Sequence, residues 1–402
     1  MTAPVARVDA AAEERRLLDF ARGSAATPTG FAWLDERGVP DLSQPVHTWI
    51  TTRMTHVFSL AHLQAVEDAA GLAAHGVRAL AGSLRDHEHG GWYAAVSHGG
   101  RVVDATKAAY AHAFVVLAAS SASVAGVPGG EALLEEALAV VRRHFLDGDG
   151  RVVDTLAPEL SPGEPYRGAN SSMHMVEALL AAGDVTGARH WHDVALGIAE
   201  HLIHDVARQH GYLLPEHFTV DWQPLLDYNV DTPADPFRPY GCTPGHLLEW
   251  SRLLLHLDAT VPDPPVWLVE DAQALFEEAC EDAWFVDGAR GFVYTVDWER
   301  RPVVRSRMHW VHAEALAAAA ALHRRTGDTS YRAWQGTFEK YIATHLIDSE
   351  LGSWHHELDE HNRPAATTWR GKPDVYHAYQ ALLLARMPLT PVLSVQLARG
   401  QL

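Results

Sequence analysis

The sequence predicts an all-α protein built as an (α/α)6 barrel, with six inner and six outer helices. Long stretches rich in Ala and Leu repeat their apolar residues every three or four positions, which is the period of an α-helix. Six polar helix openings also recur at intervals of roughly 55 to 75 residues, as expected for a repeated helix pair. Because six such pairs can close into a ring, we expect residues 1–402 to form one catalytic domain.

The predicted helices follow one another along the whole sequence, separated by loops in which Gly precedes an aromatic residue. Examples of these loops are Gly90–Tyr93, Gly291–Tyr294 and Gly352–Trp354. Long loops in a helical protein commonly carry function. An open solenoid is the alternative architecture, but its repeats are usually shorter and more uniform. The clearest apolar stretches are Ala61–Leu80, Ala108–Ala122, Met173–Ala182, Leu247–Leu257 and Ala313–Arg325.

Each inner helix is predicted to begin with polar or aromatic residues that include a histidine. Thr243 is a candidate N-cap followed by Pro244, and Asp374 is a similar cap. Asn170, or one of the serines after it, can cap the third helix. In a closed barrel these six helix starts meet at one end. The openings are Arg53–His56, Lys107–His112, Asn170–His174, Thr243–His246, Arg307–Trp310 and Asp374–His377.

Composition excludes several classes of partner. The 402-residue protein is 47% hydrophobic and 21% charged, with a formal net charge of -19. This negative charge argues against nucleic acid and anionic membranes as partners. The N-terminal sequence lacks an apolar signal segment, and no apolar run approaches the ~20 residues of a membrane span. With only Cys242 and Cys280 available, no disulfide scaffold is expected and the protein is expected to be cytoplasmic. Its oligomeric state is expected to be monomer or homodimer.

Histidine is unusually frequent, with 26 copies, and its position at helix starts suggests acid–base chemistry. A helix N-terminus carries about half a positive charge, which disfavours imidazolium and keeps the ring neutral and able to accept a proton. Many of the histidines are expected to be surface or capping residues. His246 and His377 are the stronger candidates, and Glu249 follows His246 on the same helical face. His174 is either a pocket ligand or a buried structural residue.

Other side chains near these histidines could bind a polyhydroxylated ligand. Arg53 and Arg238 could bind sugar hydroxyls or a developing oxyanion, or could form structural ion pairs. Tyr110, Trp310 and Trp369 could stack on a sugar, although aromatic residues at helical spacing are often core residues.

No metal or cofactor motif occurs in the sequence. The nearest metal-like spacings are His309-x-x-His312 and His355-His356-Glu357, without an obvious carboxylate partner set. The sequence also lacks a nucleophile elbow, a P-loop and a dinucleotide fingerprint. We therefore predict no metal and no cofactor.

Four segments resemble the N-acylglucosamine 2-epimerase superfamily, and most closely its aldose–ketose isomerase branch, which includes enzymes for D-mannose and for sulfoquinovose. The segment from Phe237 to Trp250 is the most specific. The resemblance implies an (α/α)6 barrel and an isomerase that works without a metal. The resembling segments are Arg53–His56, Arg167–His174, Phe237–Trp250 and Lys372–His377.

The resemblance also implies roles for individual residues. His246 and His377 match the acid–base pair, with His377 carrying the proton between C2 and C1 and His246 serving ring opening or the opposite face, or the reverse. The implied reaction interconverts D-mannose and D-fructose, with D-lyxose and D-xylulose as a further pair, through a cis-enediol. Residues that match the sugar pocket are Arg53, Tyr110, Asn170, His174, Arg238, Glu249 and, more loosely, Trp310 and Trp369.

Alternative functions differ in what the pocket must contain. A mannose or cellobiose 2-epimerase would use nearly the same residues, with acid–base groups on both faces of the sugar. An (α/α)6 glycoside hydrolase would need a carboxylic acid in the pocket, for which Asp104, Glu216 and Glu249 are candidates. A non-catalytic sugar-binding protein would use the barrel only as a scaffold. The sequence leaves plain and sulfonated hexoses open as substrates.

Overall fold

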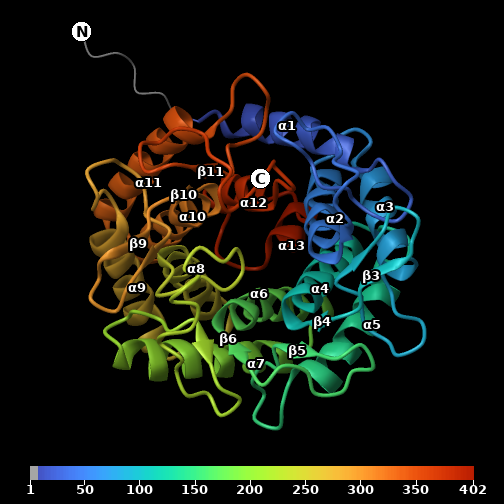
Figure 1. The fold of residues 1–402 in the computed structure, drawn as a ribbon, viewed down its shortest axis with the longest axis horizontal. Coiled ribbons are helices and arrows are strands. Elements are labelled where there is room, and N and C mark those ends of the chain that lie inside the picture. The colour runs from blue at the N-terminus through green and yellow to red at the C-terminus, as the bar shows by residue number, and fades with distance from the viewer. Residues whose placement is uncertain (1–7) are drawn as a thin grey trace.

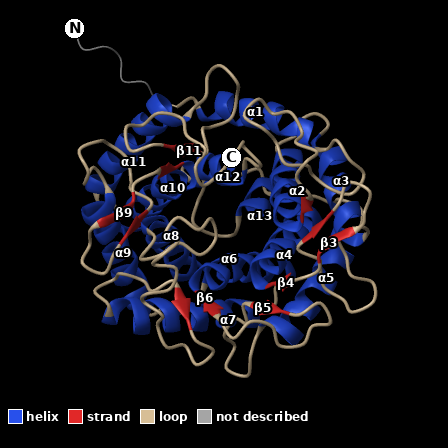
Figure 2. Ribbon diagram, viewed as in Figure 1, coloured by secondary structure: helices blue, strands red, loops and turns tan. Residues whose placement is uncertain are grey.

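A computed structural model describes residues 8–402 and confirms the all-α prediction (Figure 1). Helices dominate the structure, and strands are short and lie near helix ends (Figure 2). Within residues 8–402, six inner helices surround the axis and each begins in or near the polar segments that the sequence indicates. These are α2 (Thr48–Leu63), α4 (Ala109–Val124), α6 (Ala169–Thr186), α8 (Pro244–Thr260), α10 (His309–Thr326) and α12 (Tyr376–Leu384).

An outer layer of six helices packs on the inner ring in the same described range. Each outer helix contacts an inner helix, and α1 contacts α12, so the first outer helix pairs with the last inner one. Three outer helices continue into a short π-helical segment: 141–145, 200–207 and 342–346. The outer helices are α1 (Ala10–Ala21), α3 (Ala69–Ala81), α5 (Gly130–Val140), α7 (His190–Ala199), α9 (Trp267–Ala283) and α11 (Thr329–Tyr341).

The inner ring is closed. Each inner helix contacts the next one, and α12 returns to α2. The C-terminal helix α13 (Leu393–Ala398) contacts α2 and α4 and lies toward the centre of the ring (Figure 1). The inner helices are buried over nearly all of their surface because their Ala and Leu residues face both the axis and the outer layer. These contacts confirm the predicted (α/α)6 barrel.

Short antiparallel strands attach the starts of inner helices to neighbouring loops. The residue two positions before α4, Lys107, pairs with Leu156, and the equivalent residue before α10, Arg307, pairs with Leu358. Cys242, before α8, forms an isolated bridge with Val296. The strands are β1 (Val46–His47), β2 (Ala95–Val96), β3 (Val102–Asp104), β4 (Lys107–Ala108), β5 (Thr155–Leu156), β6 (Arg167–Gly168), β7 (His217–Phe218), β8 (Thr295–Val296), β9 (Pro302–Val304), β10 (Arg307–Met308) and β11 (Glu357–Leu358).

The Gly–aromatic loops are built the same way in different repeats. Trp92, Phe292 and Trp354 are fully buried, so each loop inserts its aromatic residue into the core. A buried cation also pairs with an Asp of such a loop: Lys107 Nζ lies 2.7 Å from Asp86, and Lys372 Nζ lies 2.7 Å from Asp348. Such paired buried charges hold the loops close to the helix starts.

Three local predictions were wrong. The stretch Ala61–Leu80 is not one helix, because α2 ends at Leu63 and both Ala65 and Asp68 adopt positive φ before α3 begins. The third inner helix begins at Ala169, so no side chain of the Asn170 segment caps it. His56 lies more than two turns inside α2, since that helix begins at Thr48, before the predicted opening.

The N-terminal segment tested for a signal sequence lies partly outside the described residues, because the structure describes the protein from residue 8. Among the helices of residues 8–402, none combines the length and the apolar character required to cross a membrane.

Candidate active site

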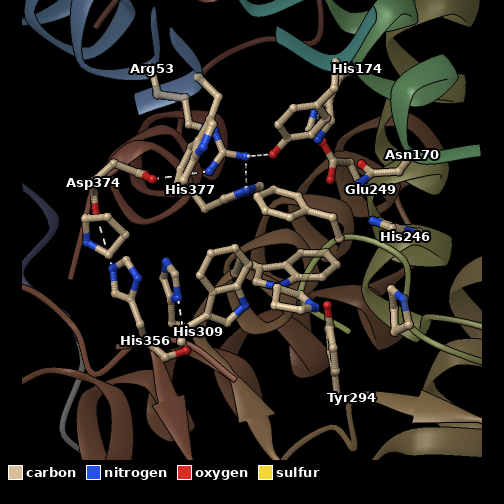
Figure 3. Close-up of a pocket in the computed structure, with 18 residues that line it drawn as sticks. Arg53, Asn170, His174, His246, Glu249, Tyr294, His309, His356, Asp374 and His377 are labelled. Atoms are coloured by element: carbon tan, nitrogen blue, oxygen red, sulfur yellow. Dashed lines mark hydrogen bonds and ion pairs between the residues drawn. The ribbon is translucent and has the colours of Figure 1, made fainter. Parts of the chain in front are cut away.

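A pocket of about 660 Å³ opens where the N-termini of the inner helices converge (Figure 3). Its lining combines aromatic residues with buried polar ones, including five histidines. Those histidines are His174, His246, His309, His356 and His377, and His356 stacks against His309.

Equivalent positions of the inner helices line this pocket. The second residue of five of them lines the pocket: Trp49, Tyr110, Asn170, Trp310 and His377. Residues one turn further along five of the inner helices form a deeper layer. That layer consists of Arg53, Phe114, His174, Glu249 and Glu314, each the sixth residue of its helix. The repeated fold therefore places equivalent positions of distant segments around one cavity.

Glycine replaces a larger side chain at the second position of α8. A Cβ on Gly245 would lie 2.5 Å from the ring of Trp310, so the indole fills the space that a side chain would take. The Trp310 ring lies 5.1 Å from the ring of His246 and 5.7 Å from that of His377, measured between centroids. The indole therefore lies against both histidines.

His377 is held in one tautomer by contacts on both of its nitrogens. Its Nδ1 lies 2.9 Å from Oε1 of Glu314, a buried carboxylate that can only accept a hydrogen bond when ionised. Its Nε2 lies 3.4 Å from Nη2 of Arg53, which can only donate. We therefore assign the proton to Nδ1, and leave a lone pair on Nε2. Burial and the Arg53 charge lower the pKa of His377 well below its usual value, so the ring is neutral.

Arg53 connects this histidine to other pocket residues. Its guanidinium donates to Oδ2 of Asp374 at 3.2 Å and to the hydroxyl of Tyr110 at 2.6 Å. It also lies over the ring of Phe114, 4.6 Å from the centroid. Burial raises the pKa of Tyr110 to about 12, so its hydroxyl stays protonated and can donate to a ligand. Arg53 is thus a fixed positive charge next to the lone pair of His377.

His246 has a similar carboxylate partner elsewhere in the pocket wall. Its Nδ1 lies 2.8 Å from Oε1 of Glu216, which is also buried and comes from the loop before β7. This contact again places the proton on Nδ1 and directs Nε2 into the pocket. Two histidine–carboxylate pairs therefore face the same cavity from two different helices.

His309 and His356 form a stacked pair in the pocket wall, with ring centroids 3.8 Å apart. Burial lowers the pKa of His309 to about 4 and that of His356 well below its usual value, so both rings are neutral. His356 Nε2 donates to the carbonyl of Asp374 at 3.2 Å. His309 thus presents a neutral, buried imidazole edge to the pocket.

Several buried polar atoms of the pocket have no hydrogen-bond partner among residues 8–402. They include Oδ1 of Asn170, Nε2 of His309, Nδ1 of His174 and Oε2 of Glu249. Burying an unpaired polar group costs about 1–3 kcal/mol, so these atoms favour a ligand rich in hydroxyl groups. Burial lowers the pKa of His174 to about 4, whereas burial and the nearby Glu314 raise the pKa of Glu249 well above its usual range.

The structure brings nine of the ten predicted site residues into the pocket. Arg238 is the exception, although its neighbours Phe237 and Pro239 line the pocket. Its guanidinium turns away, 2.8 Å from Glu164 and 3.4 Å from Asp154, and stacks on Tyr166. Arg238 therefore forms the structural ion pair that was the alternative to sugar binding. The nine residues in the pocket are Arg53, Tyr110, Asn170, His174, His246, Glu249, Trp310, Trp369 and His377.

The structure also places the general-acid candidate Asp104 and the metal-like pair His309 and His312. Asp104 lies exposed on β3, outside the pocket lining. His309 and His312 do not share a ligand-binding face, because His312 accepts a hydrogen bond from the backbone N–H of Phe292.

The sequence did not predict several residues that line the pocket or contact its side chains. Glu314 sits in the Ala-rich stretch of α10 and looked like part of an apolar helix. Aligning the six helix starts would have identified it, since it occupies the same sixth position as Arg53 and Glu249. Residues contributed by loops carry no such signal. Missed lining residues are Trp49, Phe237, Tyr294, His309, His356 and Asp374.

A family model described as N-acylglucosamine 2-epimerase (GlcNAc 2-epimerase) matches residues 30–381. The protein belongs to the N-acylglucosamine 2-epimerase family. The match spans the inner helices almost completely, from before α2 into α12, and therefore covers the elements that form the pocket. Membership of this family confirms the resemblance noted in the sequence.

Relatives of this protein share most of its length. A D-mannose isomerase from Thermobifida fusca is 55% identical over 389 residues, covering 96% of both proteins. A D-mannose isomerase from Pseudomonas cannabina pv. alisalensis is 49% identical, covering 96% of this protein and 94% of the relative. A crystal structure of D-mannose isomerase matches with a TM-score of 0.88 at 29% identity, covering 96% of this protein and 99% of that one.

Proposed function

We propose that this protein is an aldose–ketose isomerase that interconverts D-mannose and D-fructose through a cis-enediol, without a metal, and that D-lyxose and D-xylulose form a further substrate pair. The observation that carries the proposal is the environment of His377. A neutral imidazole with an Nε2 lone pair 3.4 Å from the fixed guanidinium of Arg53 faces a pocket suited to a small polar ligand. The extensive identity to two D-mannose isomerases supports the same reaction.

The proposed chemistry follows from these positions. In the acyclic form of D-mannose the carbonyl at C1 acidifies the proton on C2. His377 Nε2 removes that proton, the C1–C2 bond gains double-bond character, and negative charge develops on the C1 oxygen. Arg53 and Tyr110 supply donors that stabilise this charge. The same imidazolium then returns the proton to C1 while the O2 proton moves to the C1 oxygen, so that the C2 carbonyl and the C1 hydroxyl of D-fructose form together.

His246 serves ring opening in this proposal. The pyranose form of the sugar must open before C2 can be deprotonated, which requires a proton to leave the anomeric hydroxyl and another to reach the ring oxygen. His246 presents its Nε2 to the pocket while Glu216 holds its Nδ1, so it can exchange protons at a position separate from His377. Asn170, His174 and Glu249 bind hydroxyl groups, and Trp310 and Trp369 contact the apolar face of the sugar.

The charge of the pocket favours a plain sugar over a sulfonated one. Arg53 is the only Lys or Arg among the residues that line the described pocket, and Asp374 already pairs with it. Arg238, the other cation considered for this role, is engaged by two carboxylates outside the lining. A sulfonate would need an uncompensated donor group at the far end of the pocket.

We further place the enzyme in the cytoplasm as a monomer or homodimer. Both cysteines, Cys242 and Cys280, are free in the structure, which fits a reducing compartment.

Product analysis tests the proposed reaction. The purified protein is incubated with D-mannose in the presence of EDTA, and the sugars are separated and quantified over time. We expect D-fructose to form until equilibrium is reached, with the same rate with and without EDTA or a faster rate with it. D-glucose as the first product would identify a 2-epimerase instead. Activity that requires an added metal, or no conversion of D-mannose, would contradict the proposal.

A further inference from the structure

Three buried carboxylates surround a single guanidinium directly beneath the sugar pocket. Arg252 Nε donates to Glu314 at 3.0 Å, and Nη2 lies 3.4 Å from both Glu177 and Glu249. All four side chains are at least nine-tenths buried. With all three carboxylates ionised, the cluster would carry a net charge of about -2, and burying uncompensated charge is costly.

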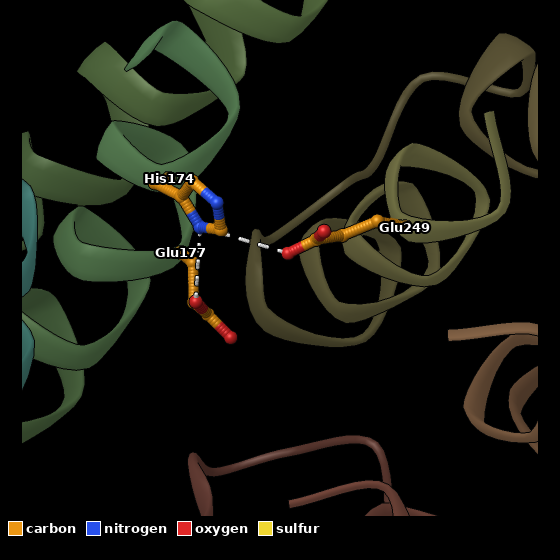
Figure 4. Close-up of side chains that lie close together, drawn as sticks. All are labelled: His174, Glu177 and Glu249. Atoms are coloured by element: carbon orange, nitrogen blue, oxygen red, sulfur yellow. Dashed lines mark ion pairs between the residues drawn. The ribbon is translucent and has the colours of Figure 1, made fainter. Parts of the chain in front are cut away.

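One imidazole nitrogen points into this cluster without making a hydrogen bond. His174 Nδ1 lies 3.7 Å from Oε2 of Glu177 and 3.7 Å from Oε1 of Glu249 (Figure 4). Neither distance is short enough for a hydrogen bond, and Nδ1 has no other partner among residues 8–402. The second oxygen of Glu249, Oε2, is also buried without a partner there. His174 and Glu249 therefore each bring an unpaired polar atom to the cluster, whereas both oxygens of Glu177 accept hydrogen bonds from Tyr376, Gln380 and Arg252.

The spacing of these atoms matches metal coordination. The three ligand atoms from His174, Glu177 and Glu249 all lie within 4.8 Å of one another. Zinc binds histidine nitrogen and carboxylate oxygen at about 2.0–2.2 Å in a tetrahedron, which separates neighbouring ligand atoms by about 3.4 Å. Small side-chain rotations would close the observed 3.7 Å separations to that value. Two of the three residues also line the pocket, so the fourth position would face the sugar site.

The ligand types restrict which ion would bind. One imidazole and two carboxylates suit Zn²⁺ and similar transition-metal ions, whereas Mg²⁺ and Ca²⁺ prefer all-oxygen coordination with more ligands. A divalent cation would also balance the net charge of the carboxylate cluster around Arg252.

We propose that His174, Glu177 and Glu249 form a binding site for one Zn²⁺ ion, and that the ion inhibits the enzyme. Inhibition rests on the proposed function and follows because the ion occupies His174 and Glu249, which the sugar pocket uses for binding. The metal site is thus regulatory rather than catalytic. Zinc binding is measured directly, so its outcome is separate from whether the protein isomerises D-mannose.

The test is a calorimetric titration of EDTA-treated, dialysed protein with Zn²⁺. We expect one strongly bound equivalent per protein molecule, with affinity lowered at least roughly tenfold in both His174→Asn and Glu177→Gln. His204→Asn is the matched control, since His204 forms a histidine–carboxylate pair with Asp271 on the outer layer. The control should retain the bound equivalent.

Cobalt provides a second measurement on the unaltered protein, which stays informative if a variant does not fold. Co²⁺ in the site should give a visible absorption band that saturating D-fructose removes. The proposal is overturned if the wild-type protein binds no stoichiometric Zn²⁺, if folded His174→Asn and Glu177→Gln variants both bind it with unchanged affinity, or if sugar leaves the Co²⁺ spectrum unchanged.

Discussion

Four histidines lie in the first turn of an inner helix, and they form two pairs that differ in their hydrogen-bond partners. His112 and His312 occupy the fourth position of α4 and α10, where Nδ1 donates to a carbonyl four residues earlier, at 2.8 and 2.9 Å. Their Nε2 atoms accept from the backbone N–H of Trp92 and Phe292, at 3.2 and 3.1 Å. Both nitrogens of each ring are therefore used to fasten a loop to a helix.

His246 and His377 each contact a carboxylate through Nδ1 rather than a peptide group, and Nε2 of His377 also lies 3.4 Å from Nη2 of Arg53. Their Nε2 atoms face the pocket. A carboxylate stabilises the imidazolium that forms when the ring takes a proton, whereas a neutral peptide carbonyl does so weakly. The partner of a helix-start histidine, and not its position alone, therefore separates a structural role from proton transfer.

The largest expected effect is the loss of turnover when His377, whose Nδ1 contacts Glu314, is replaced. His377→Asn should lower kcat for D-mannose by roughly a thousandfold or more, because no other group in contact with Arg53 offers a neutral basic nitrogen. The melting temperature should stay close to that of the wild-type protein. Kinetics on D-mannose and thermal unfolding measure both, with the exposed residue variant His361→Asn as control. A folded variant with nearly normal kcat would remove His377 from the mechanism.

Replacing a histidine whose ring binds only backbone groups should lower stability and leave turnover nearly unchanged. His312→Asn removes a buried acceptor from Phe292 N–H and a ring stacked 4.3 Å from Tyr341, so we expect a loss of about 3 kcal/mol in the free energy of unfolding. The kcat of the folded variant should stay within about threefold of wild type. Denaturant unfolding and kinetics test this prediction. Loss of turnover without loss of stability would contradict the structural role.

Acid should reduce the difference in stability between His312→Asn and wild type. Burial lowers the pKa of His312 to about 3, so the ring stays neutral in the folded protein while the unfolded protein takes up a proton near its ordinary pKa of 6.5. Stability from this group is present above pH 6.5 and falls as the pH decreases. Between about pH 7.5 and 5 the difference should shrink by about 2 kcal/mol. A constant difference across this range would disagree with a neutral buried ring.

The carboxylate itself should matter less than the histidine that it supports. Glu314→Gln keeps the shape but offers one acceptor oxygen in place of two, so the contact to either His377 or Arg252 is lost. We expect kcat to fall roughly tenfold, with KM changing much less. The exposed variant Glu135→Gln serves as control. An unchanged kcat in the folded variant would mean that the carboxylate does not support proton transfer.

The barrel was predictable because its signals are local and repeated. Ala-rich helices and polar openings occur six times. An error within one repeat, such as predicting a single helix over Ala61–Leu80, therefore leaves the predicted number of repeats and the closed ring unchanged. The family motif located His246 and His377. The partners that distinguish these histidines from His112 and His312 lie far away in sequence, so spacing could not reveal them.

Arg238 illustrates the same limit for charged residues. Its motif predicts a sugar-binding side chain, but Asp154 and Glu164 come from a loop more than 70 residues earlier and turn it away from the pocket. Whether such an ion pair forms depends on how loops that are distant in sequence pack together. In contrast, Glu314 was recoverable from the helix register, because the inner helices that carry Arg53, His174 and Glu249 present their sixth residue to the same depth.

The most direct test measures D-fructose formed from D-mannose by equal amounts of folded wild-type, His377→Asn and His312→Asn protein. We expect wild type and His312→Asn to produce D-fructose at similar rates, and His377→Asn to produce almost none. A rate near wild type for His377→Asn, or a folded His312→Asn variant that forms almost no D-fructose, would contradict the assignment of His377 as the base.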